Sequence, residues 1–563
     1  MKKDSKVKRI DFSRKRLGWI ADKYYNEGDY VSALKFAYRE LEMYGGNGDV
    51  FARLADIYEG MNLQGMAINY WFQFLHIADE EELPDIYEGL AVNYLALGQE
   101  MQAAFYYNRL IDVDDEIPEE TKLDIAEAFS DSKKNKFRFV YPPRLADYTE
   151  EFNWGSRALK AGDCKRAVEF FSKIEKGSKQ YLQGKELQAI AYMLDGNTEQ
   201  AKQACLEILE EVPNDVRALA TLSAVYGEQG LQEQSRAIAE RLAEMHTEDT
   251  DELFKIATVC CENGLDQEAF KRFELLDQKT PYDGRVLYFK GVSAFKSGFT
   301  KTAVDAFEKL ITIYPDAEVA RYYWKALREY QDGGPMPTLT YFYHLPQEER
   351  EARCVNLMHI NKCNQQDAQL FGFLALQDRY FEWCFDEMDG NDQDLQYLGL
   401  ITAVHVGADS FLQDVLLDYE VADVLKLEVL RMLLERNEEN QFGLVLYNIY
   451  RKIFLPRISI GRKRRKKFVQ AYAKVASKFI ILKETYGEVI RLATEKLYRA
   501  LEGYNALDLV DSVDDCACAI FLLTGIKELG NDPNRIASVF EANLAKVQVL
   551  LTEALSSDYG MKG

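Results

Sequence analysis

The chain has little histidine, little proline and no long apolar run. Its 563 residues include five histidines, a thin supply for acid–base catalysis near neutral pH. Twelve prolines are too few for a collagen-like or linker-rich chain, and nine cysteines without regular spacing do not form a disulfide framework. The length predicts several domains or an array of repeats.

Signals for membranes and secretion are also scarce. The N-terminal stretch MKKDSKVKRIDFSRKRLGW is basic but lacks the apolar core of a signal peptide. The longest run without a charged residue extends from Leu395 to Ala408, well short of the ~20 residues that span a membrane. We therefore expect a cytoplasmic protein.

Known catalytic and metal-binding motifs are missing. No phosphate-binding loop, dinucleotide-binding glycine motif, nucleophile elbow or zinc-protease motif occurs. The best set of metal ligands is Cys354, His359 and Cys363 with His344, but only His359 and Cys363 share a helical face. The stretch DGNDQDLQYLGL begins like a calcium loop but has Asp394 where glycine is required. We expect no catalytic residue, no metal and no cofactor.

The net charge of −23 is unevenly distributed. Residues 1–16 hold eight Lys or Arg and two Asp, and residues 451–467 hold nine Lys or Arg and no acid. The rest of the chain is therefore strongly acidic and repels phosphate backbones at long range.

Four stretches repeat with an exact period. Gly196, Gly230, Gly264 and Gly298 are each 34 residues apart, and a small residue follows each glycine after five positions. Small residues allow two helices to approach closely, and glycine allows the left-handed conformation that ends a helix. The small-residue position extends along the chain as Ala33, Ala67, Ala103, Ala167, Ala201, Ser235, Ala269 and Ala303.

This pattern resembles the tetratricopeptide repeat (TPR), a helix–turn–helix unit of 34 residues. Further small residues match the first helix of each unit: Ala21, Ala55, Ala91, Gly155, Ala189, Ser223, Ala257 and Gly291. The resemblance implies an all-α TPR superhelical solenoid of about eight repeats, interrupted after the third, followed by a C-terminal helical domain.

The expected domains follow from the repeats. They are a basic tail (1–16), repeats 1–3 (17–114), an irregular insertion with one helix (115–147), repeats 4–8 with a capping helix (148–331), a linker (332–337) and a C-terminal α-helical domain (338–563). The last of these is only vaguely similar to HEAT-like helical repeats. In the insertion, Phe137, Phe139 and Tyr141 alternate with other residues. They either plug a junction between two sub-arrays or stack on single-stranded nucleic acid.

The resemblance also implies a binding groove. In the family the concave face is lined by four positions of each first helix. Here these positions are acidic in repeats 1–3 and mixed or apolar in repeats 5–8, which favours a basic partner for the former and a peptide or amphipathic helix for the latter. The family's clamp for acidic C-termini needs Asn where this chain has other residues, which disfavours a chaperone cofactor. The candidate groove residues are Asp22, Asp56, Glu59, Asp85, Glu88, Gln183, Glu186, Ile190, Met193, Arg217, Phe254, Thr258, Arg285, Tyr288, Val292 and Phe295.

The stretch GRKRRKKF contains six consecutive cations: Arg462, Lys463, Arg464, Arg465, Lys466 and Lys467. It could bind nucleic acid, with Phe468 and Tyr472 available to stack on bases. It could also be a nuclear import signal, a partner for the acidic groove in cis or between molecules, or a solvated loop between helices.

The sequence thus favours a non-enzymatic scaffold that binds protein or peptide partners in its groove. The alternative is a nucleic-acid-associated regulator that uses residues 462–467 and senses a partner through its repeats. An enzyme of unknown class in residues 338–563 is a third hypothesis. The partner and the oligomeric state stay open.

Overall fold

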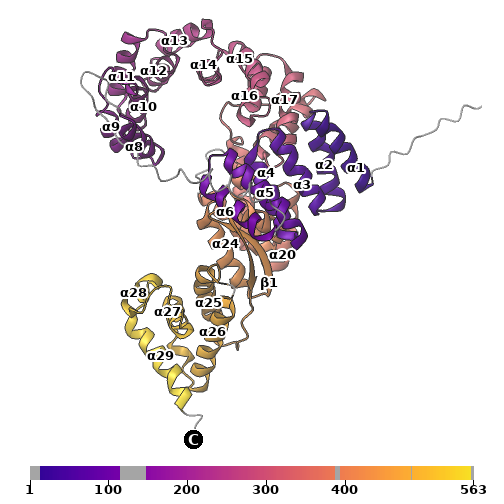
Figure 1. Cartoon of the computed structure of the whole chain (residues 1–563), viewed down its shortest axis with the longest axis vertical. Helices are drawn as coiled ribbons and strands as arrows, with labels where there is room; N and C mark the ends of the chain where they lie inside the picture. The colour runs from indigo at the N-terminus through magenta and orange to yellow at the C-terminus, as the bar shows by residue number, and fades with distance from the viewer. Residues whose placement is uncertain (1–12, 115–147, 387–392, 484, 560–563) are drawn as a thin grey trace, which may run out of the picture. The chain divides into compact units, whose positions relative to one another are not determined.

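A computed structural model describes residues 13–114, 148–386, 393–483 and 485–559 (Figure 1). Most of the basic tail, the insertion 115–147 with its alternating aromatics, and the start of the calcium-like stretch lie outside these residues. The described chain is almost entirely helical and divides into two compact units. One unit contains repeats 1–3 together with residues 346–385 and 390–563, and the other contains repeats 4–8, residues 332–345 and Asp386.

This division differs from the expected domains. Residues 338–345, expected in the C-terminal domain, belong to the unit of repeats 4–8. Most of the C-terminal domain forms one unit with repeats 1–3, from which the sequence separates it by more than two hundred residues. The contacts that cause each difference are given below.

Repeats 4–8 are consecutive helix pairs, which follow one another around a curve in Figure 1. They are α8 (Thr149–Lys160) with α9 (Cys164–Phe171), α10 (Tyr181–Leu194) with α11 (Thr198–Glu211), α12 (Val216–Glu228) with α13 (Gln232–Glu244), α14 (Thr250–Glu262) with α15 (Asp266–Lys279), and α16 (Gly284–Lys296) with α17 (Thr300–Ile313). The amphipathic helix α18 (Glu318–Gln331) follows the last pair, as expected for a cap.

The residues of the repeat pattern have the expected roles. Gly196, Gly230, Gly264 and Gly298 end the first helices with φ of 77°, 73°, 69° and 88°. The small residues of both helices are buried. A Cβ atom on Gly291 would lie 2.7 Å from the Phe307 ring, so only glycine fits at this crossing. The helical-repeat fold is therefore confirmed by the helices themselves.

Repeats 1–3 have the same construction. They are α1 (Arg14–Asn26) with α2 (Tyr30–Tyr44), α3 (Gly48–Gly60) with α4 (Gln64–Ile77), and α5 (Leu83–Ala96) with α6 (Glu100–Val113); the short 3₁₀ helix η1 (Glu80–Glu82) precedes α5. Asn62 replaces the glycine of the second repeat and adopts the same left-handed conformation, with φ of 58°.

The described part of the C-terminal region is helical with one exception. Its helices are α19 (Gln347–Lys362), α20 (Gln365–Gln377), α21 (Tyr380–Asp386), α22 (Gln393–Val406), α23 (Asp409–Leu417), α24 (Asp423–Arg436), α25 (Arg465–Phe479), α26 (Thr485–Gly503), the 3₁₀ helix η3 (Leu507–Leu509), α27 (Val513–Thr524), α28 (Pro533–Phe540) and α29 (Leu544–Tyr559). The exception is an antiparallel hairpin of β1 (Asn440–Leu446) and β2 (Ile449–Leu455), which the sequence did not predict within this otherwise helical domain.

The hairpin closes through a two-residue turn in which Tyr447 and Asn448 both have positive φ, 52° and 63°. Two-residue turns of this kind match the twist of the flanking strands. The outer edge of β1 is occupied by side chains, because Gln413 exchanges two hydrogen bonds with the backbone of Gly443, at 2.9 and 3.0 Å. Lys426 donates to the carbonyl of Val445 at 2.8 Å.

The second helices of repeats 2 and 3 pack against the hairpin and the end of α23. Asn69 of α4 donates to Asp418 at 3.2 Å and accepts from the backbone N–H of Tyr419 at 3.0 Å. His76 lies 3.1 Å from the Tyr450 hydroxyl. Leu417 and Val445 are fully buried in one cluster with α4, α5 and α6. These contacts place the C-terminal region in one compact unit with the first three repeats.

Candidate functional site

We use the term inner face for the surface formed by the first helix of each repeat. In repeats 4–8 these helices are α8, α10, α12, α14 and α16, and in repeats 1–3 they are α1, α3 and α5. All sixteen candidate groove residues lie on these helices.

The inner face of repeats 5–7 is accessible. Gln183 is exposed, and a further five candidate residues are partly exposed: Ile190, Met193, Arg217, Phe254 and Thr258. Glu186 is the exception, with a relative exposure of 8%. Its carboxylate lies 3.6 Å from Arg217 and 3.9 Å from Lys255. Burial raises the pKa of Glu186, and these two cations oppose the rise.

The inner face of repeat 8 is covered. Tyr288, Val292 and Phe295 are buried, so the expectation that they line an open groove was wrong. Phe295 packs edge-on against Tyr330 of the capping helix, at 6.0 Å between ring centroids. Tyr288 is covered by residues 339–345, a non-helical stretch of the same chain that follows the linker and bends at residues 341–344.

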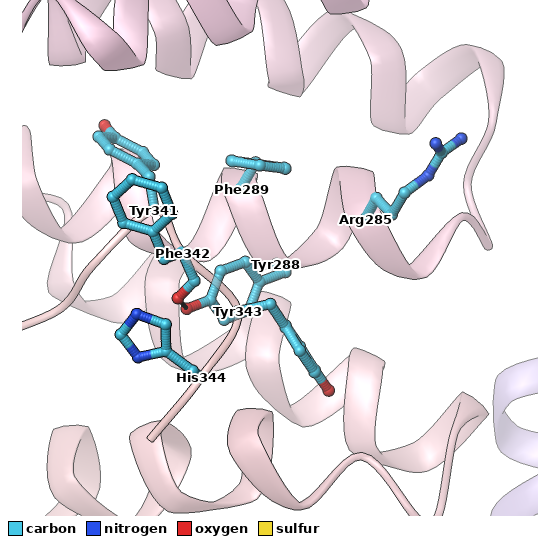
Figure 2. A pocket seen from close by; sticks show the side chains of 7 residues that line it. All are labelled: Arg285, Tyr288, Phe289, Tyr341, Phe342, Tyr343 and His344. Carbon is cyan, nitrogen blue, oxygen red and sulfur yellow. Dashed lines mark hydrogen bonds between the residues drawn. The ribbon is translucent and has the colours of Figure 1, made fainter. Parts of the chain in front are cut away.

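The backbone of this stretch is held by the inner face. The Tyr288 hydroxyl donates to the carbonyl of Thr340 at 2.9 Å and to that of Phe342 at 3.0 Å. The bond to Phe342 is drawn in Figure 2. The hydroxyl of Tyr323, on α18, donates to the His344 carbonyl at 3.0 Å. Side-chain donors from the inner helix α16 and the capping helix α18 therefore bind a peptide backbone directly.

Alternate side chains of the stretch point inward. Leu339 and Leu345 are 4% and 0% exposed. Tyr341 stacks on Phe289, at 6.1 Å between ring centroids, and its hydroxyl donates to Asp266 at 2.7 Å. Tyr343 follows the same pattern. It lies 4.8 Å from the Tyr288 ring and donates to the partly buried carboxylate of Asp386 at 2.9 Å.

The intervening side chains point away from the helices. Phe342 is 73% exposed, and its ring stacks on His344 at 6.0 Å. A cavity of about 160 Å³ remains between this outer pair and the inner helices. Its lining is aromatic except for Arg285, which lies at one end of the group in Figure 2, away from Tyr341, Phe342 and His344. Sequence reasoning assigned residues 338–345 to another domain and missed this layer, although LTYFYHL has Leu or Tyr at every second position.

The inner face of repeats 1–3 is acidic. Asp22 pairs with Arg53 at 2.5 Å, and Glu59 accepts from the indole N–H of Trp71 at 3.1 Å. Asp85 and Glu88 are exposed and, among the described residues, form no ion pair.

Asp56 lies in the middle of this acidic surface. Partial desolvation and the adjacent charge of Glu59 raise its pKa to about 6, although Arg53 lowers it. A cation bound beside Asp56 would therefore favour release of its proton near pH 6.

The basic run pairs with the C-terminal region itself. Asp508 accepts from Lys463 at 2.8 Å and lies 3.6 Å from Arg464. Arg465 donates to the Ile460 carbonyl at 3.3 Å, and Lys467 donates to the carbonyls of Val510 and Asp511. These partners are not the acidic side chains of repeats 1–3.

Only two of the six cations have no such partner among the described residues, Arg462 and Lys466, and both are exposed. Phe468 and Tyr472, expected to be available for base stacking, are fully buried. Phe468 packs on Tyr498, at 5.0 Å between ring centroids, and the Tyr472 hydroxyl donates to the Pro456 carbonyl at 2.7 Å. The stacking hypothesis for these two rings was therefore wrong.

Reactive side chains occupy structural positions. Cys205 and Cys260 are buried between helices, and burial raises the pKa of their thiols to about 12 and about 11. His359 lies 3.7 Å from the Cys363 sulfur. Within the described parts of the chain, no three His, Cys, Asp or Glu side chains are grouped as metal ligands. None of the described helices combines the length and the apolar character needed to cross a membrane.

No protein-family profile and no curated protein matches the chain. Solved TPR structures have similar helices. YrrB, described as a TPR protein with an unusual peptide-binding site, is 18% identical over 32% of this chain and 92% of its own length, with a TM-score of 0.25. A TPR protein from Parabacteroides merdae is 16% identical over 56% of this chain and 98% of its own, with a TM-score of 0.27. MamA is 18% identical over 31% and 94%, with a TM-score of 0.24. Because these TM-scores are low, the repeat architecture is inferred from the helix pairs described above and not from these similarities.

Proposed function

We propose that the chain is a non-enzymatic scaffold that binds extended peptide segments of protein partners on its inner face. The observation that carries this proposal is the stretch 339–345. It is bound to the last repeat and the capping helix by hydrogen bonds to its backbone and by inward tyrosine rings. A surface that holds one non-helical segment in this manner has the chemistry to hold another on the adjoining repeats.

The accessible part of repeats 5–7 suits such a partner. It combines apolar and polar side chains, Ile190, Met193, Phe254 and Thr258, with the ion cluster around Glu186. Apolar anchors provide most of the binding energy at an interface, and charged groups set partner selectivity.

Repeats 1–3 favour a basic partner. The second helices of repeats 2 and 3 pack against the hairpin and α23, whereas Asp56, Asp85 and Glu88 on the first helices are exposed. A cationic peptide is the complement of this surface. No observation favours nucleic acid over protein, because four of the six cations of the basic run have partners within the C-terminal region.

Site-specific photo-cross-linking tests the proposal. A benzoylphenylalanine side chain replaces Ile190 on the inner face or, as the matched control, the exposed Leu206 on the second helix of the same repeat. After irradiation in cells, the Ile190 variant should form protein adducts that survive nuclease treatment, and the Leu206 variant should form few. Equal adducts at both positions, or adducts that nuclease removes, would contradict the proposal.

A further inference from the structure

The cavity beside residues 339–345 has the size of a single aromatic ring. Its volume is about 160 Å³, and a cavity of about 150 Å³ with an apolar lining accommodates benzene. Five of its seven lining residues are Phe or Tyr: Tyr288, Phe289, Tyr341, Phe342 and Tyr343. Ring faces and edges arranged in this way favour a further ring over an aliphatic side chain.

The orientation of Phe342 supports a binding role for the cavity. Every inward side chain of the stretch is at least partly buried, whereas Phe342 is 73% exposed and is stacked on His344. Together they form an aromatic wall over the inner face (Figure 2). Exposed aromatic side chains held in a fixed position are typical anchors of protein interfaces.

One end of the cavity carries a positive charge. The Arg285 side chain is 62% exposed, and its guanidinium lies over the Phe254 ring at 5.2 Å. The carboxylate closest to Arg285, that of Asp283, lies 3.5 Å away and already accepts from the backbone N–H groups of Arg285 and Val286. Arg285 therefore retains donors for a second carboxylate.

Three further charged side chains lie near the cavity. Lys296 adds a cation, with its ammonium group 4.5 Å from the Tyr341 ring centroid. Asp266 and Asp386 each accept from a tyrosine hydroxyl of the stretch 339–345. The exposed guanidinium of Arg285, at one end of the cavity, therefore favours a carboxylate of the ligand at that end.

We infer that this cavity binds an aromatic side chain of a partner peptide, next to an acidic residue whose carboxylate pairs with Arg285. The inference rests on the proposed function and specifies the partner for the end of the groove at repeat 8. Residues 339–345 are then part of the binding site, because Phe342 and His344 form one of its walls.

Three fluorescein-labelled peptides test the inference on the full-length protein: GSEFESG, GSEAESG and GSQFQSG. Measured by fluorescence anisotropy, GSEFESG should bind at least tenfold more tightly than either of the other two peptides. Arg285→Gln should remove the preference for the Glu-containing peptide GSEFESG over GSQFQSG. It should leave the preference for GSEFESG over GSEAESG, which reports the Phe ring. Phe342→Ala should weaken both Phe-containing peptides about tenfold. Arg236→Gln, on the second helix α13, is the matched control and should change nothing.

Circular dichroism and the melting temperature confirm that each variant is folded. Saturation-transfer NMR with 3-phenylpropionate, a ring and a carboxylate without a peptide backbone, provides a second readout. Equal binding of the three peptides, no binding of any, or an unchanged Glu preference in Arg285→Gln would overturn the inference. Cross-links at Ile190 without any aromatic preference would overturn this inference and leave the scaffold function intact.

Discussion

The Tyr106 hydroxyl, in the third repeat, donates a 2.6 Å hydrogen bond to the backbone carbonyl of Asn448, 342 residues later in the hairpin turn. Tyr106 is 1% exposed and also stacks on Tyr94, at 5.7 Å and 5° between ring planes. One side chain thus belongs both to the core of the repeats and to the surface that holds the hairpin. The first three repeats and the C-terminal region are therefore expected to unfold together.

Tyr106→Phe tests this coupling. The substitution keeps the ring but removes the donor to Asn448, and a lost buried hydrogen bond costs about 1 kcal/mol or more. Urea denaturation should show one transition for repeats 1–3 and the C-terminal region, shifted to lower urea. Tyr504→Phe, whose side chain is 49% exposed, is the control and should not shift it. Separate transitions for the repeats and the hairpin would contradict the coupling.

Lys426 should make stability depend on pH. Its side chain is 1% exposed, and burial lowers its pKa from 10.5 to about 8, although Asp418 and Asp423 oppose the change. Between pH 8 and 10.5 the unfolded chain binds more protons than the folded chain, so the free energy of unfolding rises with pH. The full effect of this group is about 3 kcal/mol.

The measurement is a comparison with Lys426→Met, which has no titrating group. The wild-type protein should gain stability relative to this variant as the pH rises from 7 to 10, measured by urea denaturation at each pH. Lys452→Met, at an exposed position of β2, controls for the removal of one charge. A constant difference between wild type and Lys426→Met across this range would show that Lys426 does not carry the effect.

The basic run should contribute little to nucleic-acid binding. Only Arg462 and Lys466 lack a partner among the described residues, and each phosphate contact adds about 0.9 to the slope of log affinity against log salt. We expect Arg462→Gln with Lys466→Gln to reduce that slope on duplex DNA by no more than about 2. Anisotropy titrations from low to moderate salt measure it. A reduction of 4 or more when all six cations of the run are replaced by Gln would mean that the run leaves Asp508 and acts as one binding element.

Asp56 should make the binding of a basic peptide depend on pH. Its pKa is raised to about 6, and a bound cation favours the ionised form, so affinity should increase as the pH rises through 6. A synthetic peptide with the sequence GRKRRKKF is a suitable probe, and isothermal titration calorimetry from pH 5 to 7.5 measures both affinity and proton release. Asp56→Asn should bind more weakly and without this pH step. If the pH step persists in Asp56→Asn, it arises from a group other than Asp56.

The repeats could be predicted from the sequence because their constraints are local. Gly298 ends a helix through its own backbone conformation, and Gly291 is fixed by one neighbouring ring. The hairpin was harder to predict from the sequence, because its turn has Tyr447 and Asn448 in place of the usual Asn-Gly. Its burial also depends on helices that are distant in the sequence. The cover over Tyr288 was missed for the same reason. Whether a side chain on an inner helix is exposed depends on residues 339–345, which lie outside the repeat pattern.

The hydrogen bonds of Tyr288 provide the most direct test of that cover. Tyr288→Phe keeps the ring against Tyr343 but removes the donor to the carbonyls of Thr340 and Phe342. Because the repeat helices do not depend on this donor, the variant should keep its circular dichroism spectrum. Residues 339–345 should then detach from α16 more often. A loss of about 1.4 kcal/mol in the free energy of this local opening corresponds to tenfold faster exchange of the backbone amide hydrogens. Mass spectrometry of peptides from this stretch measures the change, with Tyr226→Phe on α12 as the matched control. Unchanged exchange in residues 339–345 would mean that the inward side chains alone hold the stretch in place.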